Sequence, residues 1–487
     1  MYRSRLAFAL ATAALAAILM PSSLTAQITF QRTYGGTGWD QGCSVQMTRD
    51  GGYIVAGATL TFGAGYTDVY LVKTDVAGNM LWTKTYGGPN YEYSFSVQQA
   101  ADGGYIIAGY TESFGAGQED IYLVRTDSNG DTLWTKTFGG AHYDEGLSVL
   151  QTFDGSFIVA GWTECFGAGG GDVWLIKANA NGDTLWTRTF GGTSDDWGRS
   201  VQQTADSGFI ITGSTGSYGA GQGDVWLIKT DANGDTMWTR TFGSTSDDGG
   251  SSVQQTADGG YIVAGSTESF GAGDRDLYLV KTNAGGDTIW TRTVDGAANC
   301  DGYSVQQTSD GGYIVAGATW PTGAVFTDLY LVKTNANGDT QWSRTYGGTY
   351  SDYGWSVQQT PDGGYIIGGE TDSYGAGSAD VYLIKTDSLG EVAVAEPKTS
   401  PTRAPALALT CEPSPSSGTT RISFKPQTSS SKPLTLRVHD ALGTLVLSQP
   451  VRASSFIFHP SSLPSGTYFL RLDAGSHHAT ARMVLQR

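Results

Sequence analysis

Residues whose types could do chemistry recur along this chain at a fixed spacing. The stretch DANGDTMWTRTFG, residues 231–243, begins with oxygen-bearing side chains at alternate positions, as a calcium-binding loop does. A helix–loop–helix calcium site also needs its glycine two positions after Gly234, a distal bidentate glutamate and flanking helices, and none of these is present. Asn233-Gly234 between two β-rich runs is instead a strong hairpin signal. The stretch therefore predicts a turn with positive φ angles at Asn-Gly, and no metal ion.

A second set of acidic residues occupies one shared position along the chain. Its members are Asp40, Glu92, Asp144, Asp196, Asp248 and Asp352. One interpretation is a ring that attracts cations, which makes Asp144, Asp196, Asp248 and Asp352 candidate metal ligands. The favoured interpretation is that each carboxylate accepts backbone N–H bonds within its own loop, as aspartate does in turns. The sequence predicts no cofactor and no resident metal.

Motifs for catalysis are scarce. The sequence has no recognisable Ser–His pair, no glycine-rich phosphate loop and no zinc-ligand spacing. Adjacent carboxylates such as Asp195-Asp196 and Asp247-Asp248 could do acid–base work, but neighbours on a loop usually point apart. We therefore predict no catalytic residues, and keep a secreted carbohydrate-active hydrolase or lyase, with loop carboxylates near a central channel, as the alternative.

The elements that must position these residues repeat every 52 residues. The period is set by the tryptophans Trp82, Trp134, Trp186, Trp238, Trp290 and Trp342. Each unit contains four short runs rich in Val, Ile, Tyr, Trp and Thr, such as SVQQT, YIVAGAT, DVYLVKTD and LWTKTY, bounded by Gly, Asn and Asp. Seven four-stranded units of this length predict an all-β fold, a seven-bladed β-propeller.

The two ends of the repeat array predict how the ring closes. ITFQRTYGG near the N-terminus matches the fourth run of a unit, whereas the seventh unit lacks this run after DSLGE. We expect the N-terminal strand to complete the last blade beside residues 380–387, which leaves no open sheet edge. A strand from EVAVA is the other option.

At this point the sequence resembles the secreted bacterial β-propeller repeat proteins, through DGGYIVAG-like segments and a W/Y-S/T-x-T-Y/F-GG pattern over residues 27–391. In such a fold the blade-to-blade loops lie on one face. These loops vary here, whereas the DGGY and NGD turns of the other face are nearly uniform, and variety on one face is typical of a binding surface. The candidate ligand-binding residues on this face are Trp39, Tyr91, Tyr93, Tyr143, Trp197, Arg199, Tyr353 and Trp355. Packing between blades is the alternative role for the aromatic residues.

The net charge of the chain restricts its possible partners, and its N-terminal segment predicts export. The formal net charge of −17 disfavours nucleic acid and anionic membranes as partners. Arg3 and Arg5, an apolar run from Leu6 to Met20 and small residues before Ala26 predict a signal peptide over residues 1–26. No later stretch predicts a membrane span.

The C-terminal part has a different composition. Residues 392–408 form a Pro/Thr/Ala-rich linker, and residues 409–487 alternate in the manner of a small β-sandwich of about seven strands. EPSPSSGTTRISF, VHDALGTLV, LPSGTYFLRL and the basic, apolar terminus ARMVLQR are similar to the type A C-terminal sorting domain of type IX secretion substrates. This resemblance implies export through the type IX machinery to the cell surface or the medium.

Together these observations predict an exported propeller that acts as a binding or adhesion module for an extracellular glycan or protein. Besides the hydrolase or lyase alternative, a structural role in a surface layer is compatible with the sequence, because fold alone does not determine function.

Overall fold

A computed structural model of the 487-residue chain provides the structure. It describes residues 27–294, 298–321, 324–392, 407–412, 420–426, 434–440, 444–451, 455–458, 463–474 and 477–485. The predicted signal peptide and nearly all of the predicted linker lie outside these residues. The chain divides into two compact units, Met1–Glu396 and Pro397–Arg487.

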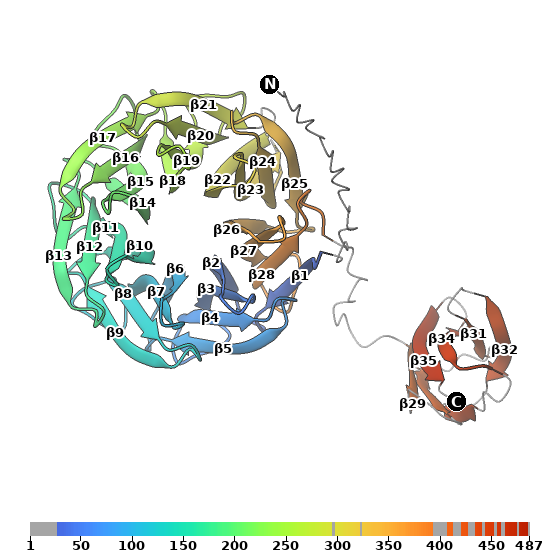
Figure 1. Ribbon diagram of the computed structural model, residues 1–487. Coiled ribbons are helices and arrows are strands. Elements are labelled where there is room, and N and C mark those ends of the chain that lie inside the picture. The colour runs from blue at the N-terminus through green and yellow to red at the C-terminus, as the bar shows by residue number, and fades with distance from the viewer. Residues whose placement is uncertain are drawn as a thin grey trace, which may run out of the picture. The chain divides into compact units, whose positions relative to one another are not determined.

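The first unit contains seven antiparallel four-stranded sheets, which Figure 1 shows arranged around a common axis. Chain order within a blade runs from the axis outward. The innermost strands are β2 (Asp40–Met47), β6 (Glu92–Gln99), β10 (Asp144–Gln151), β14 (Asp196–Gln203), β18 (Asp248–Gln255), β22 (Ala298–Gln307) and β26 (Asp352–Gln359). The second strands are β3 (Tyr53–Thr59), β7 (Tyr105–Thr111), β11 (Phe157–Thr163), β15 (Phe209–Thr215), β19 (Tyr261–Thr267), β23 (Tyr313–Pro321) and β27 (Tyr365–Thr371).

The third and fourth strands complete each blade. The third strands are β4 (Asp68–Thr74), β8 (Asp120–Thr126), β12 (Asp172–Ala178), β16 (Asp224–Thr230), β20 (Asp276–Thr282), β24 (Asp328–Thr334) and β28 (Asp380–Thr386). The fourth strands of the first six blades are β5 (Met80–Tyr86), β9 (Thr132–Phe138), β13 (Thr184–Phe190), β17 (Thr236–Phe242), β21 (Thr288–Val294) and β25 (Thr340–Tyr346). The second and third strands are almost wholly buried and supply most of the apolar residues packed between blades. The predicted seven-bladed, four-stranded propeller is confirmed.

The N-terminal strand closes the ring, as predicted. β1 (Phe30–Tyr34) pairs antiparallel with β28, and the seventh sheet has the order β1-β28-β27-β26. Phe30 and Tyr34 are buried in a cluster that contains residues of blades 7 and 1. The Tyr34 hydroxyl also donates a 2.6 Å hydrogen bond to the Gly78 carbonyl of blade 1. One short strand therefore joins the two ends of the repeat array.

The turn within residues 231–243 is a hairpin connection whose oxygen atoms are used locally. The Asp231 carboxylate accepts bonds from the N–H groups of Asn233 and Asp235, at 2.8 and 2.9 Å. Only Gly234 has a positive φ, 78°, and the pairing of β16 with β17 shifts register beside the turn. The expectation of a positive φ at Asn233 is wrong, because the bulge absorbs the extra residue and a single left-handed glycine suffices.

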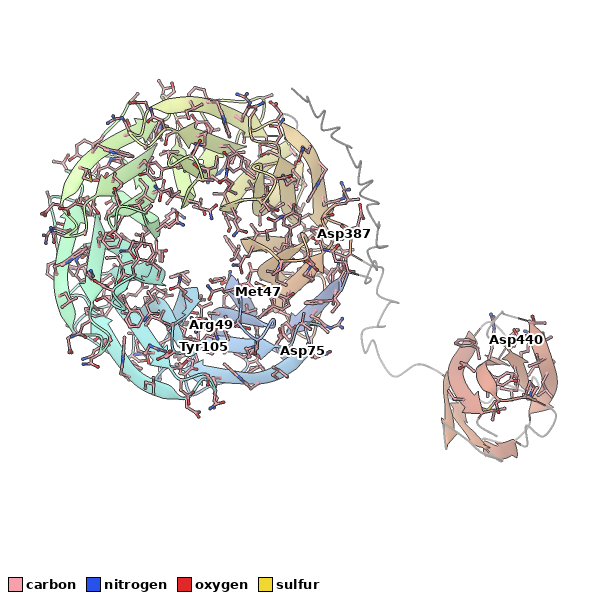
Figure 2. The ribbon with its side chains drawn as sticks, viewed as in Figure 1. Met47, Arg49, Asp75, Tyr105, Asp387 and Asp440 are labelled. Atoms are coloured by element: carbon pink, nitrogen blue, oxygen red, sulfur yellow. The ribbon has the colours of Figure 1, made fainter. Side chains whose placement is uncertain are left out.

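The same turn also fastens adjacent blades together. A Cβ on Gly234 would lie 2.7 Å from the Trp186 ring of the preceding blade, so glycine is required by packing as well as by φ. Arg188 lies 5.5 Å from the centroid of that ring and forms a 3.0 Å ion pair with Asp235. In Figure 2, Asp75 and Asp387, which open equivalent turns of blades 1 and 7, lie near the outer rim, and Met47 lies closer to the axis.

The turn between the first two strands carries one strained residue. Ser207, with φ of 68°, is the one non-glycine residue with positive φ among the described residues; equivalent positions in the other blades are glycines such as Gly259, with φ of 81°. Left-handed backbone costs an L residue about 1 kcal/mol.

We expect Ser207→Gly to raise the free energy of unfolding by about 1 kcal/mol, because it removes this strain. The matched reverse change, Gly259→Ser, should lower it by a similar amount, since a Cβ there meets no atom within 4 Å and only the backbone is strained. Urea unfolding of both variants measures the two effects. Equal stability of Ser207→Gly and the parent chain would contradict the prediction.

The second unit contains two antiparallel sheets. One has the order β29-β30-β33, from β29 (Leu407–Glu412), β30 (Thr420–Pro426) and β33 (Ser455–Phe458). The other has the order β32-β31-β34-β35, from β31 (Leu434–His439), β32 (Leu445–Val451), β34 (Gly466–Ala474) and β35 (His477–Leu485). Leu436, Val438, Leu470 and Met483 are fully buried here. Nowhere in the described ranges does a helix have the length and hydrophobicity needed to cross a bilayer.

Candidate functional site

A β-bulge in every innermost strand directs one varied residue out of the ladder. In blade 3, for example, the pairing of β10 with β11 skips Leu147, between Gly146 and Ser148. The same register shift occurs in all seven blades. Bulges of this kind leave one residue unpaired and re-aim its side chain. The bulge residues are Cys43, Phe95, Leu147, Arg199, Ser251, Tyr303 and Trp355.

A second varied position lies two residues before each bulge residue. It is occupied by Gln41, Tyr93, Glu145, Trp197, Gly249, Asp301 and Tyr353. Below the bulge the strands become uniform again, with Ser, Val and Gln at successive positions in nearly every blade. Blade-to-blade variety is therefore gathered at two levels of the channel.

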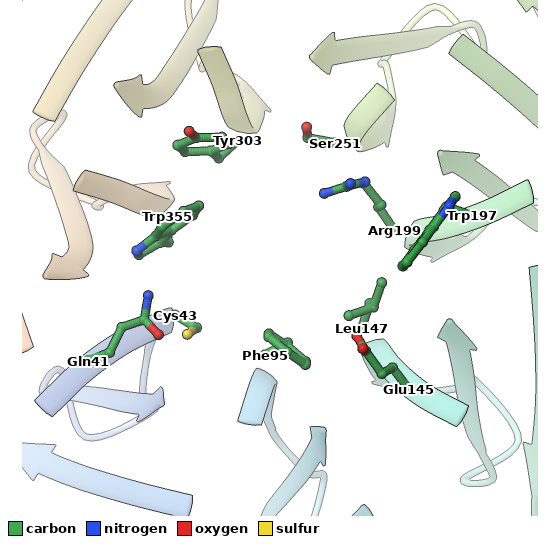
Figure 3. A pocket seen from close by; sticks show the side chains of 10 residues that line it. All are labelled: Gln41, Cys43, Phe95, Glu145, Leu147, Trp197, Arg199, Ser251, Tyr303 and Trp355. Atoms are coloured by element: carbon green, nitrogen blue, oxygen red, sulfur yellow. The ribbon is translucent and has the colours of Figure 1, made fainter. Parts of the chain in front are cut away.

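Most of these residues line one cavity of about 320 Å³, which we call the upper cavity. Its lining residues, shown in Figure 3, are Gln41, Cys43, Phe95, Glu145, Leu147, Trp197, Arg199, Ser251, Tyr303 and Trp355. Every blade contributes at least one of them, and the side chains project from the innermost strands toward a common space. The volume falls at the lower end of the range found for small-molecule sites in proteins.

The floor of the channel is built from repeated polar bonds. At each junction between blades a serine hydroxyl accepts a bond from the valine N–H of the next innermost strand, as Ser44 does from Val97 at 3.2 Å. At six of the seven junctions a glutamine side-chain carbonyl accepts a bond from the backbone N–H two residues further along, as Gln358 does from Met47 at 2.8 Å; blade 3 has Leu150 in place of this glutamine. These bonds occupy backbone donors along the channel side of the innermost strands, and rings of valine and glutamine line a separate lower space.

Aromatic rings form three groups around the upper cavity. Trp355 stacks between Tyr303 and Tyr353, with centroid distances of 4.4 and 5.4 Å. Trp197 packs 4.1 Å from Trp162 of blade 3. Tyr93 contacts Phe95, at 6.4 Å, together with Trp39 and Tyr110.

Blade 5 interrupts this wall because both of its varied positions are small. Beside Gly249 and Ser251 lies a second cavity of about 230 Å³, the side recess, which shares Arg199, Ser251 and Tyr303 with the upper cavity. Its charged wall contains Arg275, which forms a 2.7 Å ion pair with Asp301 and a 2.9 Å hydrogen bond to the Ser266 hydroxyl. The side recess adds polar groups to one side of a largely aromatic site.

The predicted binding residues fall into three groups. Trp197, Arg199 and Trp355 line the upper cavity. Tyr93 and Tyr353 pack against the lining rings of Phe95 and Trp355, and Trp39 packs against Tyr93. Tyr91 and Tyr143 are exposed, each with 39 % of its surface accessible, and Tyr91 stacks on Tyr66 of the neighbouring loop at 5.2 Å.

The acidic register is held inside the loops. Asp196 accepts bonds from the Gly192 N–H at 2.9 Å and the Ser217 hydroxyl at 2.7 Å, and Asp248 and Asp352 are bound in the same way. Asp144 accepts from the Gly140 N–H at 2.8 Å. All four side chains are buried. No group of three His, Cys, Asp or Glu residues within the described ranges is arranged to hold a metal ion.

Two glutamates at or beside the upper cavity, Glu119 and Glu145, have raised pKa values. Burial, and then the neighbouring Glu145 carboxylate, raises the pKa of Glu119 to about 7. Burial also raises the pKa of Glu145 itself, against the opposing effects of Trp162, Glu119 and Arg199. Glu145 lines the upper cavity, so a carboxyl group whose pKa is raised, mainly by burial, lies at the cavity wall with Glu119 beside it.

Several lining residues were absent from the sequence-based candidates: Gln41, Cys43, Phe95, Glu145, Leu147, Ser251 and Tyr303. The available signal was the contrast between repeats, since each of these positions varies where its neighbours do not. The prediction assigned this variety to loops and started the first strand at the SVQQT run, whereas β2 begins four residues earlier, at Asp40.

A closed seven-bladed propeller followed by a separate strand-rich unit defines this protein as a β-propeller repeat protein with an appended C-terminal domain. Residues 413–486 match the secretion system C-terminal sorting domain, and residues 100–132 match the DUF5122 beta-propeller, a domain of unknown function. The chain is thus an exported β-propeller protein with a type IX sorting domain, destined for the cell surface or extracellular space. The sorting domain implies an interaction with the type IX secretion machinery.

Similarity to individual proteins is limited. The chain is 27% identical over 202 residues to Regulatory protein FlaEY of Caulobacter vibrioides, an alignment that covers 36% of this chain and 21% of the relative. The chain thus spans about a fifth of that relative's length.

Two solved structures represent the structural similarities. Sqt1 from Chaetomium thermophilum has 11% identity and a TM-score of 0.42, covering 69% of this chain and 83% of that one. The Neurospora crassa Pan2 WD40 domain has 9% identity and a TM-score of 0.41, covering 73% and 92%. The strand pairing of the chain itself carries the assignment of the fold.

Proposed function

We propose that the propeller is a ligand-binding module that receives part of an extracellular glycan or protein in the upper cavity. The supporting observation is that variety between blades gathers at the two positions that the bulges direct toward the channel, while the strands around them are nearly uniform. A scaffold needs only the uniform residues, so the varied ones are free to serve recognition.

The lining chemistry is that of a recognition site. Trp197, Tyr303 and Trp355 give large apolar contact areas at low entropic cost, and Glu145 and Arg199 add charge of both signs. Aromatic rings with a few polar groups are typical of ligand pockets. This site lies deeper than the loop face expected from the sequence and shares three residues with it.

Binding can be tested with the purified full chain on an array of glycans and extracellular polysaccharides, with calcium and with chelator. We expect at least one specific ligand, and about a tenfold or greater loss of affinity in Trp355→Ala, because losing an aromatic contact costs about 1–3 kcal/mol. Tyr91→Ala is the matched control, since Tyr91 is an exposed aromatic residue outside the cavity, and should bind as the parent does. Affinity lost in Tyr91→Ala and kept in Trp355→Ala would place binding on the loops instead.

A second candidate is hydrolysis or elimination of a polysaccharide, and the Glu119–Glu145 pair is the observation that favours it. Burial raises the pKa of Glu145, and a carboxyl at the cavity wall that keeps its proton closer to neutral pH can act as a general acid. Release of new sugar ends from an array ligand, abolished by Glu145→Gln with binding retained, would identify this activity. Binding without release of any product would identify a module that only binds.

A further inference from the structure

The guanidinium group of Arg199 lies in the upper cavity with Glu145 nearby, but the two form no direct ion pair. Within the described residues, no hydrogen bond or ion pair holds its guanidinium group. Nearby Arg275 is bound by Asp301 and Ser266, and on the outer rim Arg188, Arg240 and Arg344 each pair with a carboxylate of the next turn. Figure 3 shows the Arg199 side chain extending toward the middle of the channel.

The surroundings of Arg199 favour an anionic occupant. The side chain is accessible to channel water, yet protein surrounds it closely enough that burial, and then the charge of Arg275, lowers its pKa. Glu145, Tyr303 and Asp301 oppose this effect. Arginine stays protonated regardless, so a confined positive charge persists that an incoming anion would stabilise. Carboxylates and sulfates match the planar guanidinium donors, which bind such groups through two parallel hydrogen bonds.

The aromatic lining favours a sugar ring beside that anion. Trp197 lies on the same strand as Arg199, at the varied position two residues before it. Tyr303 and Trp355 line the cavity from blades 6 and 7. Flat, rigid rings give apolar contact to the C–H face of a pyranose. The small residues Gly249 and Ser251 leave room next to the guanidinium group, where the side recess opens.

A peptide is a weaker match to the channel. One common mode of peptide binding adds a strand to an open sheet edge. Below the cavity the innermost strands already bond to serine and glutamine side chains of the adjacent blade, so this mode is closed to a peptide there. A long polyanion is also disfavoured, because the chain carries a formal net charge of −17 and would repel it. One acidic group at the end of an otherwise neutral chain avoids this repulsion.

We propose that the upper cavity binds, end-on, the acidic terminal sugar of a glycan that is otherwise neutral. The anionic group would lie on Arg199 and the sugar ring against Trp197 and Trp355. This proposal rests on the proposed binding function and narrows it to one class of ligand. The upper cavity, at about 320 Å³, has room for little more than one sugar ring, so the terminal residue is the part that is recognised.

The test measures binding of matched oligosaccharides to the full chain by calorimetry. The probes are a neutral oligosaccharide that ends in glucuronate, the same oligosaccharide ending in glucose, and the same one ending in a sulfated glucose. We expect the glucuronate or sulfate form to bind about tenfold or more tightly than the glucose form, with an affinity that falls as salt rises. The comparison of carboxylate with sulfate identifies the anion.

Variants separate this proposal from the broader one. Arg199→Gln should remove the preference for the acidic terminus and keep weak binding through the aromatic rings. Arg188→Gln, on the outer rim, is the matched control and should leave the affinity for every probe unchanged. Binding of the glucose form as strong as the acidic forms, lost in Trp355→Ala, would overturn this inference and leave the binding function standing. Binding instead of a peptide with a free C-terminal carboxylate, lost on amidation and in Arg199→Gln, would overturn the glycan class. Failure of every probe and of the array would overturn both.

Discussion

Deleting residues 28–36 is expected to lower the melting temperature of the propeller sharply and to make the protein associate. The deletion removes β1, and with it the backbone pairing to β28 and the buried side chains of Phe30 and Tyr34. Loss of one buried aromatic side chain costs about 3–5 kcal/mol, which is a large fraction of the stability of a typical domain. The third strand of blade 7 would then present an unpaired edge to solvent, and such edges pair with other chains.

Thermal unfolding and light scattering measure the two parts of this prediction. Tyr34→Phe is the control variant, because it removes only the hydrogen bond to Gly78 and should cost about 1 kcal/mol without association. A melting curve unchanged by the deletion would show that another segment replaces β1, or that the ring is stable while open.

Stability is expected to rise as the pH falls from 8 to about 5, and to fall again below about 4. On the neutral side, burial and the charge of Asp40 raise the pKa of Asp380 to about 6, although the Ala376 N–H opposes this. At other blade junctions, burial and then the charge of a facing carboxylate raise the pKa of Asp68, Asp172 and Asp328 in the same way. A group with a higher pKa in the folded state binds protons more tightly there, so acidification through about 6 stabilises the fold.

Below about pH 4, further acidification lowers the stability of the fold instead of raising it. Burial alone would raise the pKa of Asp258, but bonds from the Thr256 hydroxyl, Lys281 and the Gly260 N–H outweigh it and hold the value at about 2. Asp310 has the same arrangement and the same value. Such carboxylates stabilise the fold above their unfolded pKa, near 4, and this stability is lost as the pH falls toward 2.

Urea unfolding at a series of pH values tests this profile. Asp380→Asn keeps an acceptor for the Ala376 N–H and removes one of two facing charges, so it should stabilise the protein at pH 8 and have little effect at pH 5. Asp131→Asn is the control: it removes a carboxylate of an exposed outer turn that pairs with Lys84, and its effect should be small and similar at pH 8 and pH 5. Stability that declines from pH 8 to pH 5, or an Asp380→Asn variant weaker at pH 8, would contradict the assignment.

The sequence predicted the number of blades, the four strands of each and the closing strand, because each depends on spacing within the repeat and on a run missing from its last copy. It did not predict the upper cavity. The alternation of side chains between the two faces of the strand breaks at the bulge that follows Gly42 and its equivalents. Residues such as Cys43 and Phe95 were therefore assigned to loops, and the sequence did not show that their side chains point into the channel.

The environment of Arg199 was likewise beyond the sequence. Its neighbours Arg275, Tyr303 and Glu145 come from three other blades and meet only when the ring is closed. Trp197, Arg199 and Trp355 are nevertheless among the residues that the sequence predicts for binding, because they are large or charged residues in segments that differ between the repeats.

The repeated bulge has a consequence for how such a protein can change. A bulge residue lies outside the inter-strand ladder, so its replacement disturbs neither the pairing of its own blade nor the serine and glutamine bonds to the next one. In the proposed binding module, the residues that would contact the ligand and the residues that hold the fold therefore occupy different positions of the same strand. Blades can be copied, exchanged or altered at their bulges one at a time, and a lineage of such proteins can acquire new ligands while the disc that carries them stays the same.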